Sequence, residues 1–199
     1  MIKAIFFDLH KVVTHGDFND IYKRFADRVN ISAEIVSNFH RENLEGLLTG
    51  TVTSKDMLEA FDLDDKITVE KMLDIWTEEI TKLMYADAEI LSLLSKLKGA
   101  YKIGALTNLT EQRYGADIEM GLYEHFDFSV LSFKEGLKKP DPNFFLKALE
   151  QAGCASEEAV FIDDQAKNTN AAKEMGFKSI QYENIDILMK KLDALGVEV

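Results

Sequence analysis

Short runs of apolar residues recur along the chain and predict the strands of a parallel sheet. The run that opens the chain, residues 2–7, is apolar except for Lys3. A run without alternating polar positions is typical of a strand that is buried on both faces. We therefore expect helices on both sides of the sheet. Four later segments have the same character, namely residues 101–106, 128–131, 159–162 and 178–181.

Apolar residues at helical spacing separate several of these predicted strands. Residues 88–98 carry a stripe of isoleucine and leucine that favours an amphipathic helix. Residues 142–152 begin with a proline, which the first turn of a helix tolerates, and residues 168–175 end before Gly176, a common helix stop. Because strands and helices alternate, the fold class is predicted to be α/β, a Rossmann-like three-layer sandwich with a parallel sheet.

The stretch from residue 17 to residue 86 interrupts this alternation. It contains no convincing strand, and its apolar residues recur at helical spacing in about four blocks. The segments Thr49-Gly50-Thr51 and Asp62-Leu63-Asp64-Asp65 are predicted to be turns between these blocks. We therefore expect a core domain made of residues 1–16 and 87–199, and a small helical bundle inserted as residues 17–86.

Composition narrows the classes of function. A chain of 199 residues suits one core domain with a modest insertion. No apolar run reaches the length of about 18 residues that a membrane-spanning helix requires. The net charge of −12 disfavours nonspecific binding to nucleic acid, whose phosphates attract lysine and arginine. The single cysteine, Cys154, excludes an internal disulfide and favours a cytoplasmic protein.

Polar residues follow the predicted strands at the edge of the sheet where ligands bind. In a parallel α/β sheet this edge is formed by the carboxyl ends of the strands. Two of the strands end on carboxylates, one ends on a hydroxyl and an amide, and one is followed by a lysine. These residues are Asp8, Thr107, Asn108, Lys139, Asp163 and Asp164, and Asn168 follows shortly after the last of them.

This set of side chains favours the chemistry of phosphate esters. Two nearby carboxylates suit a hard cation such as Mg²⁺, which also binds phosphate oxygens. A lysine and a hydroxyl would hold the remaining phosphate oxygens. An aspartate can attack phosphorus and form an acyl phosphate, which divides hydrolysis into two easier steps. The metal and the lysine would stabilise the charge on the transferring group.

The same segments resemble the four motifs of the haloacid dehalogenase superfamily. They occur in the order that is found in the family, and the resemblance covers essentially the whole chain. The helical stretch 17–86 resembles the family's small cap of the first type. The resemblance implies a magnesium-dependent hydrolase that acts on a small phosphorylated metabolite, such as a sugar phosphate. The segments are Phe6–Val13, Leu106–Asn108, Lys139–Pro142 and Phe161–Asn168.

The resemblance also implies a role for each residue that binds the substrate phosphate. Asp8 would be the catalytic nucleophile and a metal ligand. Lys139 would neutralise both Asp8 and the phosphate. Thr107 would bind the phosphate through its hydroxyl, and Asn108 would do so through its backbone N–H.

On the metal side, Asp164 matches the metal-binding aspartate of the family. Asp163 would contact the metal through a water molecule, or it would contact the metal's ligands rather than the metal. The backbone carbonyl of His10 would complete the protein ligands. Asn168 would orient the lysine or the waters of the metal.

The residue two positions after Asp8 departs from the family pattern. Family phosphatases usually carry an acid–base aspartate there, whereas this chain has His10, followed by Lys11 in place of a frequent glycine. Three interpretations stay open: His10 is the acid–base group, the enzyme acts slowly or on good leaving groups, or the protein is a regulatory relative without turnover. The first motif also resembles a branch of sugar-phosphate phosphatases that lack this aspartate and are still hydrolases. An enzyme is therefore favoured over a relative without turnover.

The type of substrate and its contacts also admit more than one interpretation. A haloacid dehalogenase is disfavoured because the second acidic residue of the Asp163-Asp164 pair would repel a carboxylate substrate. His15 and Asp17, which lie between the first strand and the helical stretch, are candidate substrate contacts because such loops often carry function. Trp76 lies on an apolar stripe and is expected in the core. Both a monomer and a homodimer are compatible with the sequence.

Overall fold

The computed structural model of the chain describes residues 1–61 and 67–199. Its centre is a sheet of parallel strands in the order β5-β4-β1-β6-β7. The predicted strand segments and their parallel arrangement are confirmed, with ends that shift by one or two residues. The strands are β1 (Ala4–Phe7), β4 (Lys102–Thr107), β5 (Phe128–Leu131), β6 (Ala159–Asp163) and β7 (Lys178–Gln181).

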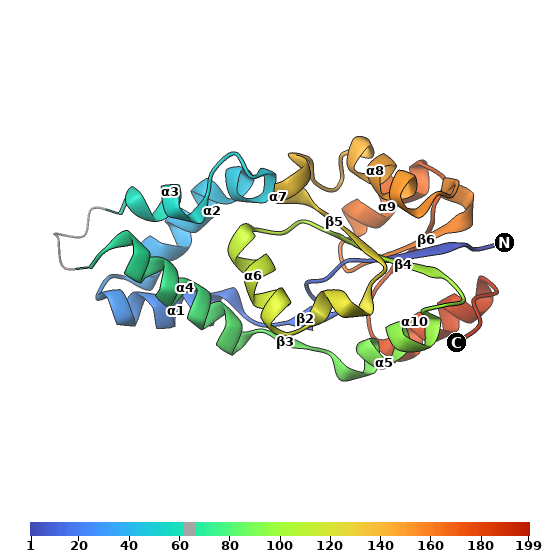
Figure 1. The fold of residues 1–199 in the computed structure, drawn as a ribbon, viewed down its shortest axis with the longest axis horizontal. Helices are drawn as coiled ribbons and strands as arrows, with labels where there is room; N and C mark the ends of the chain where they lie inside the picture. The colour runs from blue at the N-terminus through green and yellow to red at the C-terminus, as the bar shows by residue number, and fades with distance from the viewer. Residues whose placement is uncertain (62–66) are drawn as a thin grey trace.

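Helices cover both faces of the sheet, which confirms the three-layer prediction (Figure 1). Alternate residues of β1 point to opposite faces: Ile5 and Phe7 join one hydrophobic cluster, and Ala4 and Phe6 join the other. All four are fully buried, as expected for a strand between two helical layers. The first cluster packs on α5 (Ala88–Leu97) and α10 (Ile185–Ala194), and the second packs on α8 (Pro142–Ala152) and α9 (Ala166–Glu174).

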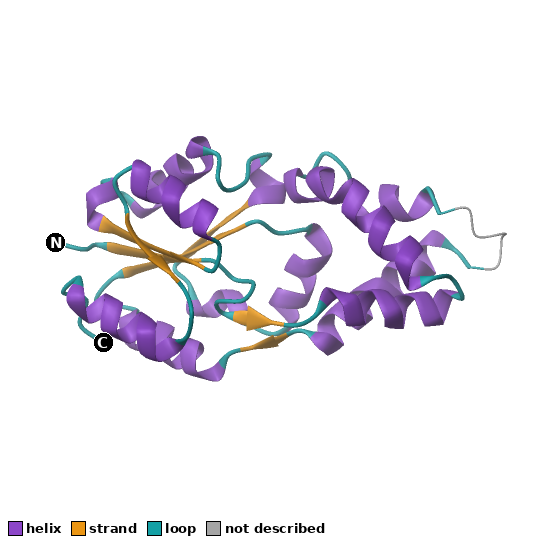
Figure 2. Cartoon of the chain, turned by 180° about the vertical axis from the view of Figure 1, so that it is seen from behind, coloured by secondary structure: helices purple, strands orange, loops and turns teal. Residues whose placement is uncertain are grey.

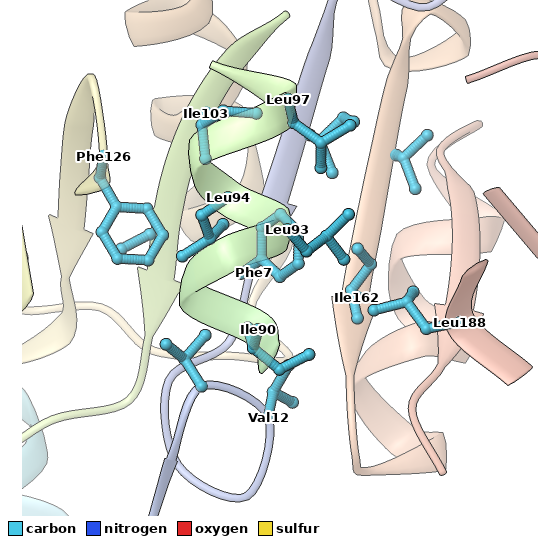
Figure 3. Close-up of a cluster of buried hydrophobic side chains, with 14 of the residues drawn as sticks. Phe7, Val12, Ile90, Leu93, Leu94, Leu97, Ile103, Phe126, Ile162 and Leu188 are labelled. Atoms are coloured by element: carbon cyan, nitrogen blue, oxygen red, sulfur yellow. The ribbon is translucent and has the colours of Figure 1, made fainter. Parts of the chain in front are cut away.

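The larger of these clusters lies between β1 and α5. Figure 3 shows Leu93 and Leu94 of α5 beside Phe7, with Leu93 on the side of Ile162 of β6, and Leu97 at the other end of the helix near Ile103 of β4. Each of these side chains is at most 3% exposed. The apolar stripe that predicted this helix is therefore the face that it buries against the sheet.

Four helices stand apart from the sheet, beyond the carboxyl ends of its strands (Figure 2). They share a hydrophobic cluster with Ala116 of the core segment, and in it Phe25 meets the ring of Trp76 edge-on at 5.1 Å. Trp76 is 2% exposed, so its expected place in the core is confirmed. The helices are α1 (Phe18–Val29), α2 (Ala33–Thr49), α3 (Ser54–Glu59) and α4 (Val69–Leu83).

The predicted turn at Thr49-Gly50-Thr51 ends α2. Gly50 has a φ of +70°, a conformation that glycine adopts without strain. A side chain at this position would also collide with the carbonyl oxygen of Phe133 in α7 (Ser132–Glu135), so the inserted helices touch the core closely here. The other predicted turn, Asp62-Leu63-Asp64-Asp65, lies outside the described residues.

Two features of the fold were not expected from the sequence. Tyr85–Ala86 (β3) pairs antiparallel with Thr14–His15 (β2), so the prediction that residues 17–86 contain no strand is wrong at its end. A two-residue strand has no periodicity that a sequence pattern can reveal. The two strands form the connection between the core and the inserted helices.

The second unexpected feature is a set of helices: α6 (Glu111–Glu119), α7, α10 and two short 3₁₀ helices, Leu122–His125 and Ser156–Glu158. The buried residues of α6 are Arg113, Ala116 and Asp117. Because two of these three are charged, α6 has no apolar stripe that could have predicted it.

The order of the strands places a crevice at the end of β1. After β1 the chain builds β4 and β5 on one side of it, and then β6 and β7 on the other. A reversal of this kind opens a ligand site at the carboxyl ends of the strands. The residue after β1 is Asp8. Among the described residues, no helix is long and apolar enough to cross a membrane.

Candidate active site

A cavity of about 600 Å³ lies between the strand ends and the inserted helices α1 and α2. The core contributes residues from the ends of β1, β4 and β6 and from the loop before α8. The helices α1 and α2 contribute apolar and aromatic residues together with Arg41 and Glu45. The core residues that define its chemistry are Asp8, His10, Asn108, Lys139, Asp164 and Asn168.

Lys139 is buried between two carboxylates. Its Nζ lies 2.7 Å from Oδ1 of Asp8 and 2.7 Å from Oδ2 of Asp163. Burial acts against the charged ammonium, but the two carboxylates outweigh it and raise the pKa of Lys139. Burial raises the pKa of Asp8 to about 6, against the opposing effect of Lys139. At neutral pH the pair is therefore an ammonium beside a carboxylate.

Asn108 holds the backbone of Lys139 in place. Its Oδ1 accepts a hydrogen bond of 2.7 Å from the N–H of Lys139, and its Nδ2 donates one of 2.9 Å to the carbonyl oxygen of Lys139. These two bonds join the loop after β4 to the loop before α8. The side chain of Asn108 thus positions the lysine, a function that the sequence did not predict.

The two neighbouring aspartates after β6 have different environments. Asp163 is fully buried and accepts hydrogen bonds from Lys139, from Nδ2 of Asn168 at 3.0 Å and from the backbone N–H of Gln165 at 2.8 Å. Asp164 lines the cavity, and its Oδ1 is buried with no hydrogen-bond partner among the described residues. Burial, followed by the charge of Asp163, raises the pKa of Asp164.

This arrangement fits a divalent cation. Carboxylate oxygens of Asp8, Asp163 and Asp164 lie within 4.8 Å of one another, and oxygen ligands are those that Mg²⁺ prefers. Asp163 is already occupied by hydrogen bonds, whereas Asp164 has an unsatisfied buried oxygen. Asp8 and Asp164 are therefore the two carboxylates available to a metal, and Asp163 lies behind them.

Thr107 and His10 also have buried atoms without a partner. The hydroxyl of Thr107, which is 1% exposed, and the Nδ1 of His10 make no hydrogen bond within the described parts of the chain. Burial, with smaller contributions from Arg113 and Lys11, lowers the pKa of His10 to about 4. The imidazole is therefore neutral at pH 7. Lys11 has a φ of +65°, a conformation that favours glycine, which is the residue that it replaces.

The structure places His15 and Asp17 outside the cavity lining. His15 lies beside Tyr85 and has its Nε2 3.5 Å from Oδ2 of Asp87. Asp17 caps α1 by accepting a hydrogen bond of 2.8 Å from the N–H of Asn19. Both residues serve the connection between the core and the inserted helices, so this placement does not support their predicted contact with substrate.

Several residues of the cavity were not predicted. Phe18, Tyr22 and His40 line it from α1 and α2. Arg113 lines it from α6, where its Nη2 donates to Thr14 at 2.6 Å and its Nε donates to Asp117 at 2.8 Å. Phe18 and Tyr22 lie four residues apart, one helical turn, and this spacing was the signal available for them in the sequence.

Curated relatives include several phosphatases. The chain is 27% identical over 195 residues to glyceraldehyde 3-phosphate phosphatase of Methanocaldococcus jannaschii, a match that covers 91% of this chain and 85% of that protein. It is 31% identical over 99 residues to flavin mononucleotide hydrolase 1 of Arabidopsis thaliana, which covers 50% of this chain and 40% of the relative. In the latter case the match spans less than half the length of the relative.

Solved structures share the whole fold. A HAD family enzyme from Bacteroides thetaiotaomicron, in complex with magnesium and inorganic phosphate, has a TM-score of 0.78 and 20% identity, and covers 94% of this chain and 99% of its own. A predicted HAD-like hydrolase from Porphyromonas gingivalis has a TM-score of 0.77 and 22% identity, with full coverage of both chains.

A family model described as haloacid dehalogenase-like hydrolase matches residues 14–182. This range includes the ends of β4 and β6 and the loop before α8, and Asp8, which follows β1, lies just before it. The match extends over most of the 199 residues. The chain belongs to the haloacid dehalogenase-like hydrolases.

Proposed function

We propose that the protein is a magnesium-dependent phosphatase that hydrolyses a small phosphomonoester through a phosphorylated Asp8. The observation that carries this proposal is the buried contact of 2.7 Å between Lys139 and Asp8 at the base of the cavity. A lysine in this position keeps Asp8 ionised and offsets its repulsion from an anionic phosphate. The relative from Methanocaldococcus jannaschii, a phosphatase by name, supports the same activity.

Asp8, Asp164 and the backbone carbonyl of His10 would hold Mg²⁺. When bound, the cation would supply positive charge that neutralises the phosphate oxygens. Asp163 would not bind it directly, because its oxygens already accept bonds from Lys139, Asn168 and Gln165. Its role in this proposal is to position Lys139, with Asn168 as a further support.

In the first step, an oxygen of Asp8 forms a bond to phosphorus while the bond from phosphorus to the leaving alcohol breaks. Thr107, through its unpartnered hydroxyl, Asn108, through its backbone N–H, and Lys139 would hold the phosphate oxygens. In the second step, water attacks phosphorus, the acyl phosphate breaks, and Asp8 is released together with inorganic phosphate. The oxygen that leaves in the first step takes a proton from solvent, and the water that attacks in the second step releases one to solvent, because the neutral imidazole of His10 has no imidazolium proton to donate.

We also propose that residues 17–86 act as a cap over the active site, with the core formed by residues 1–16 and 87–199. The inserted helices contribute one side of the cavity. Lys138, which precedes the buried lysine, forms an ion pair of 2.9 Å with Glu45 of α2 and so connects the two parts beside the cavity. A cap that contacts the core in this way would exclude water from the reaction.

The second candidate is a binding or regulatory relative without turnover, which the replacement of the acid–base aspartate by His10 favours. The experiment that separates the two is phosphate release from a panel of phosphate esters, with and without Mg²⁺. We expect release that requires Mg²⁺ and that falls to background in Asp8→Asn. Binding of Mg²⁺ without release from any ester would overturn the phosphatase. Release of phosphate by Asp8→Asn at the wild-type rate would refute the assignment of Asp8 as the nucleophile.

A further inference from the structure

The α1–α2 side of the cavity is a continuous aromatic surface. Phe18 and Tyr22 lie one helical turn apart on α1, and His40 lies beside them on α2. The rings of Phe18 and His40 stack with centroids 6.0 Å apart and planes at 21°, and the centroid of Tyr22 lies 5.5 Å from that of His40. All three residues line the cavity. We call Phe18, Tyr22 and His40 the aromatic wall.

The aromatic wall begins beside the catalytic loop and is supported from behind. The ring of Phe18 meets that of His10 edge-on at 5.7 Å, two residues from Asp8. The ring of Trp76 stacks on Tyr22, with centroids 6.0 Å apart and planes at 19°. A group attached to a phosphate at Asp8 would therefore lie against this wall, and the wall is held rigidly by the core of the inserted helices.

Two polar atoms of the aromatic wall are paired with each other. The hydroxyl of Tyr22 and Nδ1 of His40 are hydrogen-bonded at 3.0 Å, and burial lowers the pKa of His40 to about 4, so the ring is uncharged at pH 7. Leu44 and Leu48 of α2 extend the lining with apolar side chains. Arg41 and Glu45 of the same helix also line the cavity, and they pair with Asn38 and Lys138. A sugar or polyol placed against the three rings would lose hydrogen bonds to water and regain few of them from the rings, whereas a flat ring would gain stacking contacts there.

We propose that the leaving group of the substrate carries a flat aromatic or heteroaromatic ring that stacks on the aromatic wall. This inference rests on the proposed phosphatase function and narrows its substrate class. The cavity volume of about 600 Å³ lies within the range of roughly 300–1,000 Å³ that is typical of pockets for drug-sized ligands. The cavity therefore has room for a ring in addition to the phosphate.

The first test compares benzyl phosphate with cyclohexylmethyl phosphate. Both are primary alkyl esters with a six-membered ring, so they differ mainly in whether the ring is flat and aromatic. We expect kcat/KM for benzyl phosphate to be higher by roughly two- to tenfold, the value of one aromatic contact. Equal kcat/KM values in the wild type would overturn the proposal.

Two variants locate the preference on the aromatic wall. In Phe18→Leu, which removes a ring that lines the cavity, we expect the ratio of the two kcat/KM values to fall towards one. The matched control is Phe39→Leu, in which the lost ring packs on Phe61 at 4.4 Å and is not among the described residues that line the cavity. The control should keep the wild-type ratio. If the ratio is unchanged in Phe18→Leu, the preference does not arise from the aromatic wall and the proposal is wrong.

A binding measurement separates this inference from the activity. Benzylphosphonate and cyclohexylmethylphosphonate are not hydrolysed, and Trp76, the only tryptophan of the chain, stacks on Tyr22 and reports binding by its fluorescence. In the magnesium-loaded wild type we expect benzylphosphonate to bind more tightly and to change the emission of Trp76. Tighter binding of benzylphosphonate without hydrolysis of any ester would refute the phosphatase activity but support the stacking of a ring on the aromatic wall. Hydrolysis of both esters with equal binding of both phosphonates would support the phosphatase activity and refute the stacking of a ring on the aromatic wall.

Discussion

The two sides of the cavity are built on different principles. On the core side, the polar side chains are fixed by one another: Asn108 holds the backbone of Lys139, and Asp163 holds its ammonium. On the side of α1 and α2, rings such as Phe18 and Tyr22 line the cavity and pack on one another and on Trp76. Substitutions on the core side should therefore affect the reaction itself, whereas substitutions on the helical side should affect which leaving group is preferred.

The most disruptive test of this difference is Lys139→Met. It leaves Asp8 and Asp163 buried without their shared cation, which we expect to lower the free energy of unfolding at pH 7 by about 3 kcal/mol. Phosphate release should fall by about 10²–10³-fold, because the charge on the transferring group loses its partner. Urea unfolding and phosphate release measure the two effects.

The adjacent lysine provides the control for this variant. Lys138 pairs with Glu45, whose side chain is 71% exposed, and an exposed pair contributes about 0–1 kcal/mol. Lys138→Met should therefore be close to the wild type in stability. Similar losses of stability in both variants would contradict the view that the core side depends on the buried pair.

A second test adds the acid that the family usually carries. His10 is neutral at pH 7, since burial lowers its pKa to about 4, so it cannot deliver a proton as an imidazolium. We expect His10→Asp to raise kcat on alkyl phosphates by about 10²-fold, the lower end of the range for acid–base catalysis. His10→Asn is the matched control. A similar increase in both variants would attribute the gain to the loss of the imidazole ring.

The helical side should be sensitive to acid. Burial lowers the pKa of His40 to about 4 from an unfolded value of 6.5. A group with a depressed native pKa stabilises the fold above 6.5, and this contribution is lost as the pH falls towards 4. Between pH 7 and pH 5 the loss from one such histidine is about 2 kcal/mol.

Urea unfolding of the wild type and of His40→Phe at the two pH values isolates this contribution. The variant keeps an aromatic ring on the wall but has nothing to titrate at this position. We expect the wild type to lose more stability than the variant. The same pH dependence in both proteins would show that His40 is not the responsible group.

The core side was more predictable from sequence than the helical side. Asp8, Thr107 and Asp164 directly follow or end apolar runs, and parallel strands bring such positions to one edge whatever the details of packing. The structure places all three at that edge. The bonds of Asn108 to the Lys139 backbone were not predicted, because they depend on how two loops meet in space.

The helical side depends on tertiary packing. The stripe that predicted α1 consists of Ile21, Phe25 and Val29, which face the cluster inside the inserted helices. Phe18 and Tyr22 lie on the adjacent part of the helix, and only the position of α1 relative to the sheet makes them part of a cavity. Arg113 was missed for another reason, because a buried arginine on a polar helix gives no hydrophobic signal.

The central claim is that Asp8 becomes phosphorylated, and rapid acid quenching during turnover tests it most directly. The substrate is an aryl phosphate that carries radioactive phosphorus, supplied with Mg²⁺. We predict label on the peptide that contains Asp8, in a form that is stable to acid and lost in base, as expected for an acyl phosphate. Turnover without label on the protein, or an acid-labile label on His10, would contradict the assignment.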